Sequence, residues 1–362
     1  MNILMITSDR ALAYGKKAAF YNTIEELRKH FDRIDIICPK IRSTSEKNLH
    51  PFENVFIHPS LWPLIFQWLW IYGEGKKIIR ENHSSIMTVH EYAPVFNGVG
   101  ARLLHWKTHV PYILEIMHVP GVPRTSGIQE RLYRWLTHTL IAWDAQPARA
   151  VRVINQHQTP DFLVEAGVPR EKLMHIPAFY IDLNIFKPLE TSKQYDVIFI
   201  GRMANNKGLD LFIDVVERSE FTAICVGDGP LLWARAEVNR RRLKIYFAGF
   251  AKDSVQVARY INESRLLIMP SLNEGGPRVV LEAMACGVPV VATPVGIVSD
   301  VLPPECIADW DEEDISDKVK RILDDQTLYA QLRESGIRTA SQFERTSAIT
   351  KYSEFIKQTA NA

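Results

Sequence analysis

Short β-branched runs alternate with longer amphipathic stretches along the chain, and this alternation constrains the fold more than any other feature. The first run, Asn2 to Thr7, is typical of a buried strand, and Lys16 to Phe31 is typical of the helix that follows it. Further strand-like runs occur at residues 33–39, 85–90, 111–118 and 150–155. Apolar strands separated by helical lengths predict a parallel sheet with helices on both faces.

The alternation restarts in the second half of the chain, with strand-like runs at 196–201, 222–227, 245–249, 265–271 and 289–293. The polar stretch before them, Phe186 to Asp196, has no periodicity, as is common for interdomain linkers. The chain has 362 residues, which is too long for one ordinary core. We therefore expect an α/β protein of two doubly wound, Rossmann-like domains that face a central cleft.

The predicted boundaries follow from these patterns. We expect the first domain at residues 1–185, the linker at 186–195 and the second domain at 196–345. Residues 346–362 are predicted to form a helix that packs back on the first domain, because their apolar side chains recur at helical spacing. In doubly wound sheets, ligands bind outside the carboxyl ends of the strands, so we look for a site in the loops that follow them.

The composition excludes several classes of protein. Lys and Arg number 43 and Asp and Glu number 42, so there is no basic excess to favour nucleic acid as a partner. The four cysteines are scattered without a CxxC pair, which is typical of buried thiols in a reducing compartment. The N-terminus lacks the basic region and apolar stretch of a signal peptide. We expect a cytoplasmic protein.

The loop after the predicted strand 196–201 carries two cations, Arg202 and Lys207, and ends at Gly208. An arginine grips two phosphate oxygens at once, a lysine adds a point charge, and a helix N-terminus attracts anions. A diphosphate is the ligand that fits, although two solvated loop cations are the alternative. Asn206 precedes the lysine, so the loop is not a Walker loop, and no GxGxxG opens a helix.

The stretch NEGGPRVVLEAMACGVPVVAT at 273–293 places Glu274 before a glycine turn and Glu282 after it. Gly275 and Gly276 allow the backbone to approach a ligand closely. Glu282 is then suited to accept hydrogen bonds from the vicinal hydroxyls of a ribose, and Glu274 from those of a sugar. The alternative is a helix-start carboxylate favoured by the dipole together with a surface glutamate.

The spacing of Glu274 and Glu282 resembles the E-x7-E pattern of retaining glycosyltransferases with the two-domain GT-B fold, in the family called GT4. The stretch GRMANNKGLDLFIDVV resembles the diphosphate loop of that family, and VGDGP resembles the turn after its next strand. In the first half, MHVPG holds His118 where the family has a histidine, and IPAFYIDLNIFKP resembles its segment before the linker. The resemblance covers most of the chain.

The resemblance implies a donor that is a nucleotide-diphosphate sugar, transfer with retention of anomeric configuration, no cofactor and no bound metal. It implies that Arg202 and Lys207 neutralise the leaving diphosphate, which is electrostatic stabilisation of developing charge. Glu282 is expected to hold the ribose, and Glu274 and His118 the donor sugar. The base is expected near Phe250 to Lys252. The donor-binding residues implied are Gly15, Arg202, Lys207, Glu274, Gly275, Gly276, Arg278 and Glu282.

Two features depart from the family or imitate another one. The first loop has a single glycine, Gly15, followed by Lys16 and Lys17, where the family commonly has two glycines. Asp309 to Asp314 contains a DxD, the metal signature of the other glycosyltransferase fold. Because an amphipathic stretch follows it, we interpret these acids as complements of a helix dipole.

The acceptor side is suggested by Leu61 to Tyr72, which is rich in tryptophan and has no charge. Lys76, Lys77 and Arg80 follow, and tryptophans beside cations fit a membrane surface. One interpretation is a helix packed on the first sheet. The hypothesis is that Leu61 to Arg80 contacts the inner face of the membrane and meets a lipid-linked acceptor.

The predicted function is transfer of a hexosyl-type sugar to a glycan or lipid-linked acceptor in cell-envelope or exopolysaccharide synthesis. A non-catalytic protein that only binds nucleotide-sugar and a sugar-nucleotide epimerase of the same fold are the alternatives. The sequence does not identify the nucleotide base, the donor sugar, the acceptor or the oligomeric state.

Overall fold

The structure is a computed structural model that describes residues 1–17, 19–41, 48–93, 96–178, 180–229 and 232–362. The chain divides into two compact units, each with its own parallel sheet. Unit 1 comprises Met1–Pro120, Arg131–Ala178 and Thr346–Ala362. Unit 2 comprises Gly121–Glu130 and Phe179–Arg345. The predicted class, α/β with two doubly wound parallel sheets, is confirmed.

Unit 1 contains a seven-stranded sheet in the order β3-β2-β1-β4-β5-β6-β7, with every described pairing parallel. Its strands are β1 (Asn2–Ile6), β2 (Arg33–Cys38), β3 (Val55–Pro59), β4 (Ile86–Glu91), β5 (Tyr112–Ile116), β6 (Ala150–Val153) and β7 (Leu173–His175). Aliphatic side chains fill both faces of the central strands, which is why the alternation was readable in the sequence.

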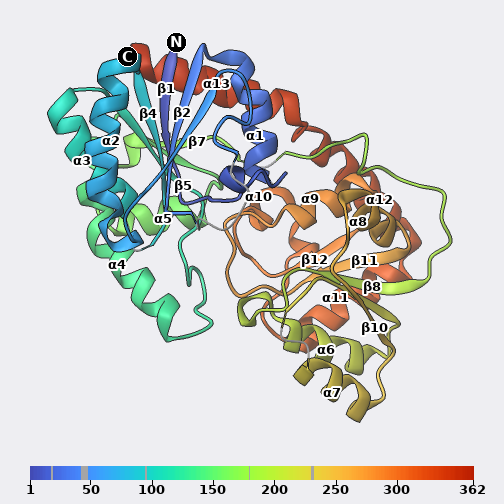
Figure 1. Cartoon of the computed structure of the whole chain (residues 1–362). Helices are drawn as coiled ribbons and strands as arrows, with labels where there is room; N and C mark the ends of the chain where they lie inside the picture. Colours follow the sequence, from blue (N-terminus) through green and yellow to red (C-terminus); the bar gives the residue numbers. More distant parts are fainter. Residues whose placement is uncertain (18, 42–47, 94–95, 179, 230–231) are drawn as a thin grey trace. The chain divides into compact units, whose positions relative to one another are not determined.

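Helices cover this sheet and include the last residues of the chain (Figure 1). They are η1 (Leu12–Tyr14), α1 (Ala19–Leu27), η2 (Arg28–His30), η3 (Leu64–Phe66), α2 (Gln67–Asn82), α3 (Phe96–Thr108), α4 (Ile128–Ala145), α5 (Gln158–Glu165), η4 (Arg170–Lys172) and α13 (Arg345–Asn361). The helix predicted from Lys16 to Phe31 is shorter in the structure, where α1 and η2 span 19–30.

Unit 2 contains a five-stranded parallel sheet in the order β10-β9-β8-β11-β12. Its strands are β8 (Tyr195–Ile200), β9 (Ala223–Val226), β10 (Ile245–Gly249), β11 (Ser264–Met269) and β12 (Val290–Ala292). Its helices are η5 (Asn205–Lys207), α6 (Leu209–Ser219), α7 (Leu232–Arg241), α8 (Ser254–Asn262), α9 (Arg278–Ala285), α10 (Val298–Val301), η6 (Pro304–Cys306), α11 (Glu312–Asp324) and α12 (Gln326–Ser341).

The units differ from the predicted domains at three places. Residues 121–130 belong to unit 2 although they lie deep in the predicted first domain, and residues 180–185 also belong to unit 2. The stretch predicted as a linker runs along unit 2, where the Leu189 amide donates to the Asn262 side chain and Lys193 Nζ donates to the Ser264 carbonyl, both at 2.8 Å. The polar composition of residues 186–195 predicted an interdomain linker, and in the structure these polar groups form hydrogen bonds with unit 2.

No helix among the described residues is both long and apolar enough to span a bilayer. Two residues of the predicted motifs, Phe179 in IPAFYIDLNIFKP and Pro230 at the end of VGDGP, lie outside the described residues.

Candidate functional site

In unit 2 the strand order reverses between β8 and β11, which pair in parallel, so their carboxyl ends lie next to each other. The loop after β8 begins at Gly201, and the loop after β11 begins at Pro270. The first loop contains Arg202 and Lys207, and the second contains Glu274. A reversal of strand order leaves a crevice at which doubly wound sheets bind ligands.

The two loops touch through their backbones. The Leu272 amide donates to the Asn206 carbonyl at 2.8 Å. Gly208 has a φ of 67°, and a Cβ at this position would come within 2.1 Å of the Pro270 carbonyl oxygen. Only glycine is compatible with both facts, so Gly208 fixes how closely the loop after β8 approaches the loop after β11.

Lys207 and Glu274, which are 67 residues apart in sequence, form an ion pair at this junction. Both side chains are only 18% exposed. Arg202 follows β8 in the same loop and is exposed. The structure thus places the two predicted cations beside one predicted glutamate, where an anionic ligand can compete with the glutamate for Lys207.

Glu282 lies on α9 behind this junction and is 14% exposed. Burial raises the pKa of its carboxyl, and the cation of Arg278, with its Nη2 atom 3.8 Å from Glu282 Oε1, opposes that shift. Gly275 is buried and Gly276 is half-buried in the turn that leads to α9. Arg278 also lies over the ring of Tyr180, with 5.6 Å from its Cζ atom to the centroid.

A hollow of about 680 Å³ opens at the carboxyl ends of β8, β9 and β10. Arg202 lines it, so the hollow adjoins the loop that carries Arg202 and Lys207. Phe250 forms part of the wall and is 79% exposed. The remaining lining residues are Ile200, Gly201, Val226, Gly227, Asp228, Gly229, Ala251, Lys252, Asp253, Ser254 and Val257.

Sequence reasoning missed a segment that supports the loop after β11. Asn273 donates through Nδ2 to the Arg124 carbonyl at 2.8 Å and to Glu130 Oε2 at 2.9 Å. Arg124 in turn stacks on Trp310, with 4.1 Å from its Cζ atom to the ring centroid. Residues 121–130 therefore hold the residue that immediately precedes Glu274. Nothing in the local sequence around Arg124 indicates this pairing.

Two predicted site residues, Gly15 and His118, belong to unit 1. Gly15 has a φ of 67°, and its amide donates to the Leu12 carbonyl at 3.0 Å, so this N–H is already engaged. His118 follows β5 and is half-buried. Their contacts with a donor stay predictions.

The DxD at 309–311 is explained by a helix cap. Asp311 is the N-cap of α11 and accepts hydrogen bonds from the Glu313 and Asp314 amides at 3.0 Å each. No group of three or more His, Cys, Asp or Glu side chains in the described part of the chain is arranged to hold a metal ion.

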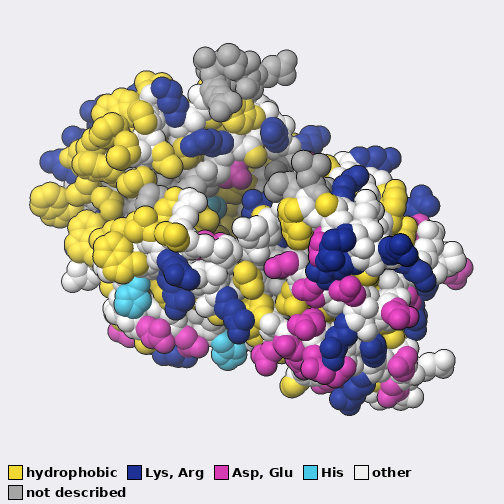
Figure 2. All heavy atoms as spheres, turned by 90° about the horizontal axis from the view of Figure 1, so that it is seen from below, with side chains coloured by type: hydrophobic (Ala, Val, Ile, Leu, Met, Phe, Trp, Pro, Cys, Tyr) yellow, Lys and Arg dark blue, Asp and Glu magenta, His cyan; other side chains and the backbone are white. Residues whose placement is uncertain are grey.

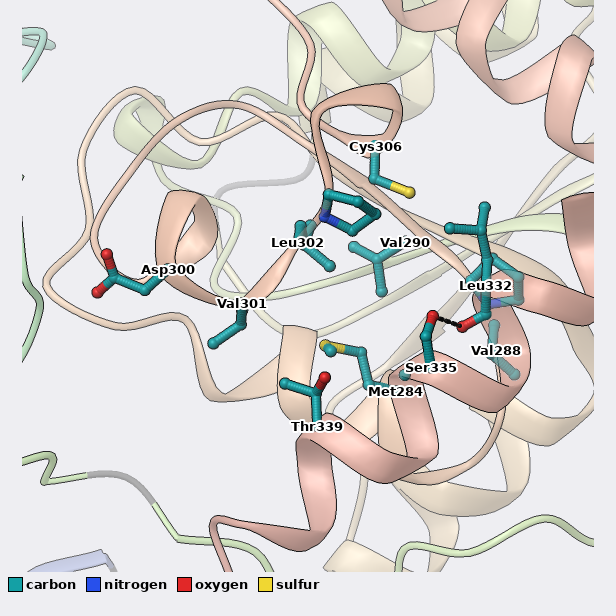
Figure 3. Close-up of a pocket in the computed structure, with 13 residues that line it drawn as sticks. Met284, Val288, Val290, Asp300, Val301, Leu302, Cys306, Leu332, Ser335 and Thr339 are labelled. Carbon is teal, nitrogen blue, oxygen red and sulfur yellow. Dashed lines mark hydrogen bonds between the residues drawn. The ribbon is translucent and has the colours of Figure 1, made fainter.

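A second hollow in unit 2, of about 290 Å³, contains none of the predicted site residues. Figure 3 shows its apolar walls, with Met284, Val290 and Leu332 among them, and a hydrogen bond of 3.2 Å from Ser335 Oγ to the Leu332 carbonyl. Burial raises the pKa of the Cys306 thiol in its wall to about 12, so this cysteine is a poor nucleophile at neutral pH.

Comparisons with known proteins point to one class. Residues 194–325 match the family described as glycosyl transferases group 1. An uncharacterized glycosyltransferase of Methanocaldococcus jannaschii is 29% identical over 304 residues, 81% of this chain and 82% of the relative. A lipopolysaccharide core biosynthesis mannosyltransferase of Rhizobium meliloti is 28% identical over 60% of this chain and 67% of the relative.

The fold is shared with solved structures. The structure of HepE from Anabaena in complex with UDP and glucose superposes with a TM-score of 0.74 at 16% identity, over 99% of this chain and all of that chain. The predicted resemblance and the predicted enzyme class are confirmed. Residues 194–325 are similar to the glycosyl transferases group 1 family, and the protein is a glycosyltransferase with the GT-B fold.

Proposed function

We propose that the protein transfers a sugar from a nucleotide-diphosphate sugar with retention of configuration, and does so without a bound metal, as GT4 enzymes do. The observation that carries the proposal is the ion pair of Lys207 with Glu274 at the β8–β11 junction, beside exposed Arg202. These groups suit a ligand that presents a diphosphate and sugar hydroxyls side by side. A site for a simple anion does not need the glutamate.

In this proposal the diphosphate accepts hydrogen bonds from Arg202 and Lys207. When the bond from the anomeric carbon to the diphosphate oxygen breaks, negative charge grows on that oxygen, and the two cations stabilise it in place of a metal. The acceptor hydroxyl oxygen bonds to the anomeric carbon, and its proton passes to the departing diphosphate. Lys207 exchanges one carboxylate oxygen of Glu274 for phosphate, which releases Glu274 toward the sugar hydroxyls. His118 is assigned to the donor sugar and Gly15 to the diphosphate by family resemblance alone.

The nucleoside is assigned to the hollow lined by Phe250, and the ribose to Glu282. An exposed aromatic ring at a hollow of about 680 Å³ suits stacking with a base. HepE of Anabaena was solved with UDP and glucose, so a uridine diphosphate sugar is the first donor to try.

For the acceptor we propose a glycan or lipid-linked glycan of the cell envelope or an exopolysaccharide. Support comes from the Rhizobium relative, whose name places it in lipopolysaccharide core biosynthesis. We assign the reaction to the cytoplasmic side of the membrane, where nucleotide sugars are the donors.

A thermal-shift screen tests the donor site. UDP, GDP, ADP and their sugar conjugates are added in the presence of EDTA to the unmutated protein, to Arg202→Ala and to the control Arg240→Ala, which removes an exposed arginine of α7. A ligand that binds the folded state raises the midpoint. We expect a rise with one nucleotide that Arg202→Ala abolishes and Arg240→Ala keeps. No rise with any nucleotide, or a rise only when EDTA is omitted, contradicts the proposal.

Turnover separates the two alternatives from transfer. If the product is an epimer of the donor and no sugar reaches an acceptor, the site belongs to an epimerase. If the donor binds but is not consumed in the presence of acceptor glycans, the protein is a non-catalytic binder.

A further inference from the structure

One helix of unit 1, α4, exposes large apolar side chains along a full face. Leu132, Trp135, Leu140 and Trp143 are 51%, 59%, 37% and 44% exposed, and their spacing places them on one side of the helix. The opposite side, with Thr137 and Ile141, is buried. A helix that buries one side in its own fold and exposes large apolar side chains on the other has a second apolar environment to meet.

The neighbouring elements extend this exposed face. On α3, Trp106 is 78% exposed, and Arg102 of the same helix stacks on Trp143 of α4 with 4.0 Å from its Cζ atom to the ring centroid. Trp106 also borders a groove shared by α2 and α3. The segment 61–66, which leads into α2, is exposed throughout. We call residues 61–66, Trp106 and the four α4 side chains together the aromatic face.

Figure 2 shows hydrophobic side chains gathered over the part of the surface formed by unit 1. The aromatic face holds four tryptophans of the eight in the chain, namely Trp62, Trp106, Trp135 and Trp143. Tryptophan has an apolar body and a polar N–H, and is therefore enriched where an apolar phase meets water.

The charged side chains within the three stretches that carry the aromatic face are cationic. The stretches 61–73, 96–109 and 131–143 contain no Asp or Glu. They do contain Lys107 and Arg131, which are both exposed. Tryptophans among cations without acids complement an interface that is apolar below and negatively charged above.

We propose that the aromatic face docks on the surface of a bilayer that contains anionic phospholipids. This goes beyond the contact predicted for residues 61–80, because most of the docking surface lies on α3 and α4. A second copy of the chain is disfavoured as the occupant, since a two-fold contact would bring two copies of the same cationic surface together. The proposal does not depend on the donor site.

Vesicle co-sedimentation of the full chain tests it. We expect binding to phosphatidylcholine vesicles that contain phosphatidylglycerol, weaker binding to pure phosphatidylcholine, and loss of binding at high salt. Trp106→Ser combined with Trp135→Ser should weaken partitioning by about tenfold or more, because both rings lie at the surface. The matched control is Trp233→Ser on α7 of unit 2, which is 47% exposed and lies among arginines.

A charge pair gives a second readout. Lys107→Glu with Arg131→Glu should abolish the preference for anionic vesicles, and the control Lys244→Glu, an exposed lysine of unit 2, should keep it. Thermal midpoints and the nucleotide-induced shift are measured for every variant, so that loss of the fold or of the donor site is recognised separately.

Three outcomes overturn the proposal. The first is absence of binding to anionic vesicles at low salt. The second is equal loss of binding in Trp233→Ser and in the Trp106 and Trp135 double variant. The third is a dimer in light scattering that the double variant dissociates, which would assign the aromatic face to a second copy of this chain.

Discussion

Both sheets have charged side chains near the carboxyl ends of their strands, but these side chains are buried in unit 1 and reach solvent in unit 2. In unit 1, Glu115 on β5 is fully buried between His90 of β4, at 2.7 Å, and Arg152 of β6, at 2.9 Å. Burial opposes ionisation of Glu115, but these two neighbours lower its pKa to about 2. In unit 2, Lys207 and Glu274 are partly exposed and Arg202 is open to solvent.

The contrast distinguishes charged side chains that are paired inside the fold from those that we assign to a ligand. Arg152 is fully used inside unit 1, since it also stacks on Tyr352 of α13 with 3.7 Å from its Cζ atom to the ring centroid. This stack helps to explain why the C-terminal helix belongs to unit 1. In unit 2 the same kinds of side chain lie in glycine-bearing loops, where a ligand can reach them. Four predictions test this distinction, from the largest expected effect to the smallest.

The largest effect is expected in the buried network of unit 1. Arg152→Met leaves Glu115 with one partner fewer in a buried site and should lower the free energy of unfolding by about 3–5 kcal/mol. Urea unfolding measures it. Arg149→Met, which removes an exposed arginine that bonds the Thr359 carbonyl at 3.1 Å, is the control and should lower it by about 1 kcal/mol or less. Equal losses would contradict the structural assignment.

The cations of unit 2 should show the reverse pattern. Arg202→Ala and Lys207→Ala should each lower kcat by about 10²–10³ because they stabilise charge that develops in the transition state. The free energy of unfolding should change little for exposed Arg202. Initial-rate kinetics with the donor found in the thermal-shift screen measure this, and Arg240→Ala is again the control. A variant that unfolds as readily as Arg152→Met but turns over normally would reverse the comparison.

The two glutamates of unit 2 should differ from each other. Glu282→Gln should raise KM for the donor by about tenfold, and Glu274→Gln should mainly lower kcat, because only the sugar contact changes in the transition state. Full Michaelis curves for both variants measure the split. If either variant has the kinetics of the unmutated enzyme, its assignment is wrong.

The smallest effect concerns two acids, Asp144 and Glu91, that are buried in unit 1. Burial raises the pKa of Asp144 to about 8, and burial together with Asp144 raises that of Glu91. Between pH 4 and 8 the folded chain therefore holds more protons than the unfolded chain, so this pair makes stability fall as pH rises. Asp144→Asn cannot ionise and should gain about 1–2 kcal/mol over the unmutated protein between pH 5.5 and 6.5.

Urea unfolding at several pH values gives the difference between the two proteins. Parallel pH profiles would show that Asp144 ionises as it does in the unfolded chain.

Most of the fold was predictable from the sequence because buried parallel strands carry continuous apolar runs. Ten of the twelve strands among the described residues lie in runs chosen from the sequence. The two missed strands, β3 and β7, are the edges of the sheet of unit 1. Edge strands have a neighbour on one side only, and both Val55–Pro59 and Leu173–His175 contain a histidine and have positions that are not buried.

The candidate site was predictable by residue type and only partly by arrangement. Arg202, Lys207 and Glu274 were chosen from two loops and Glu282 from the helix that follows the second loop, and the order of β8 and β11 makes those loops neighbours. The support of Asn273 by Arg124 and Glu130 was not foreseen, because it joins segments about 150 residues apart in different halves of the sequence. The exposed apolar faces of α3 and α4 were also missed, because apolar residues at helical spacing predict a buried face.

The sequence by itself determined the class of fold, the glycosyltransferase resemblance and the choice of residues proposed to bind a diphosphate, because each of these depends on local periodicity and spacing. Only the tertiary structure decided that Lys207 meets Glu274, that residues 121–130 join unit 2, and that the apolar face of α4 remains in solvent. Such facts depend on strand order and on which helix faces find a partner. Both are set by packing between distant segments, which no local pattern encodes.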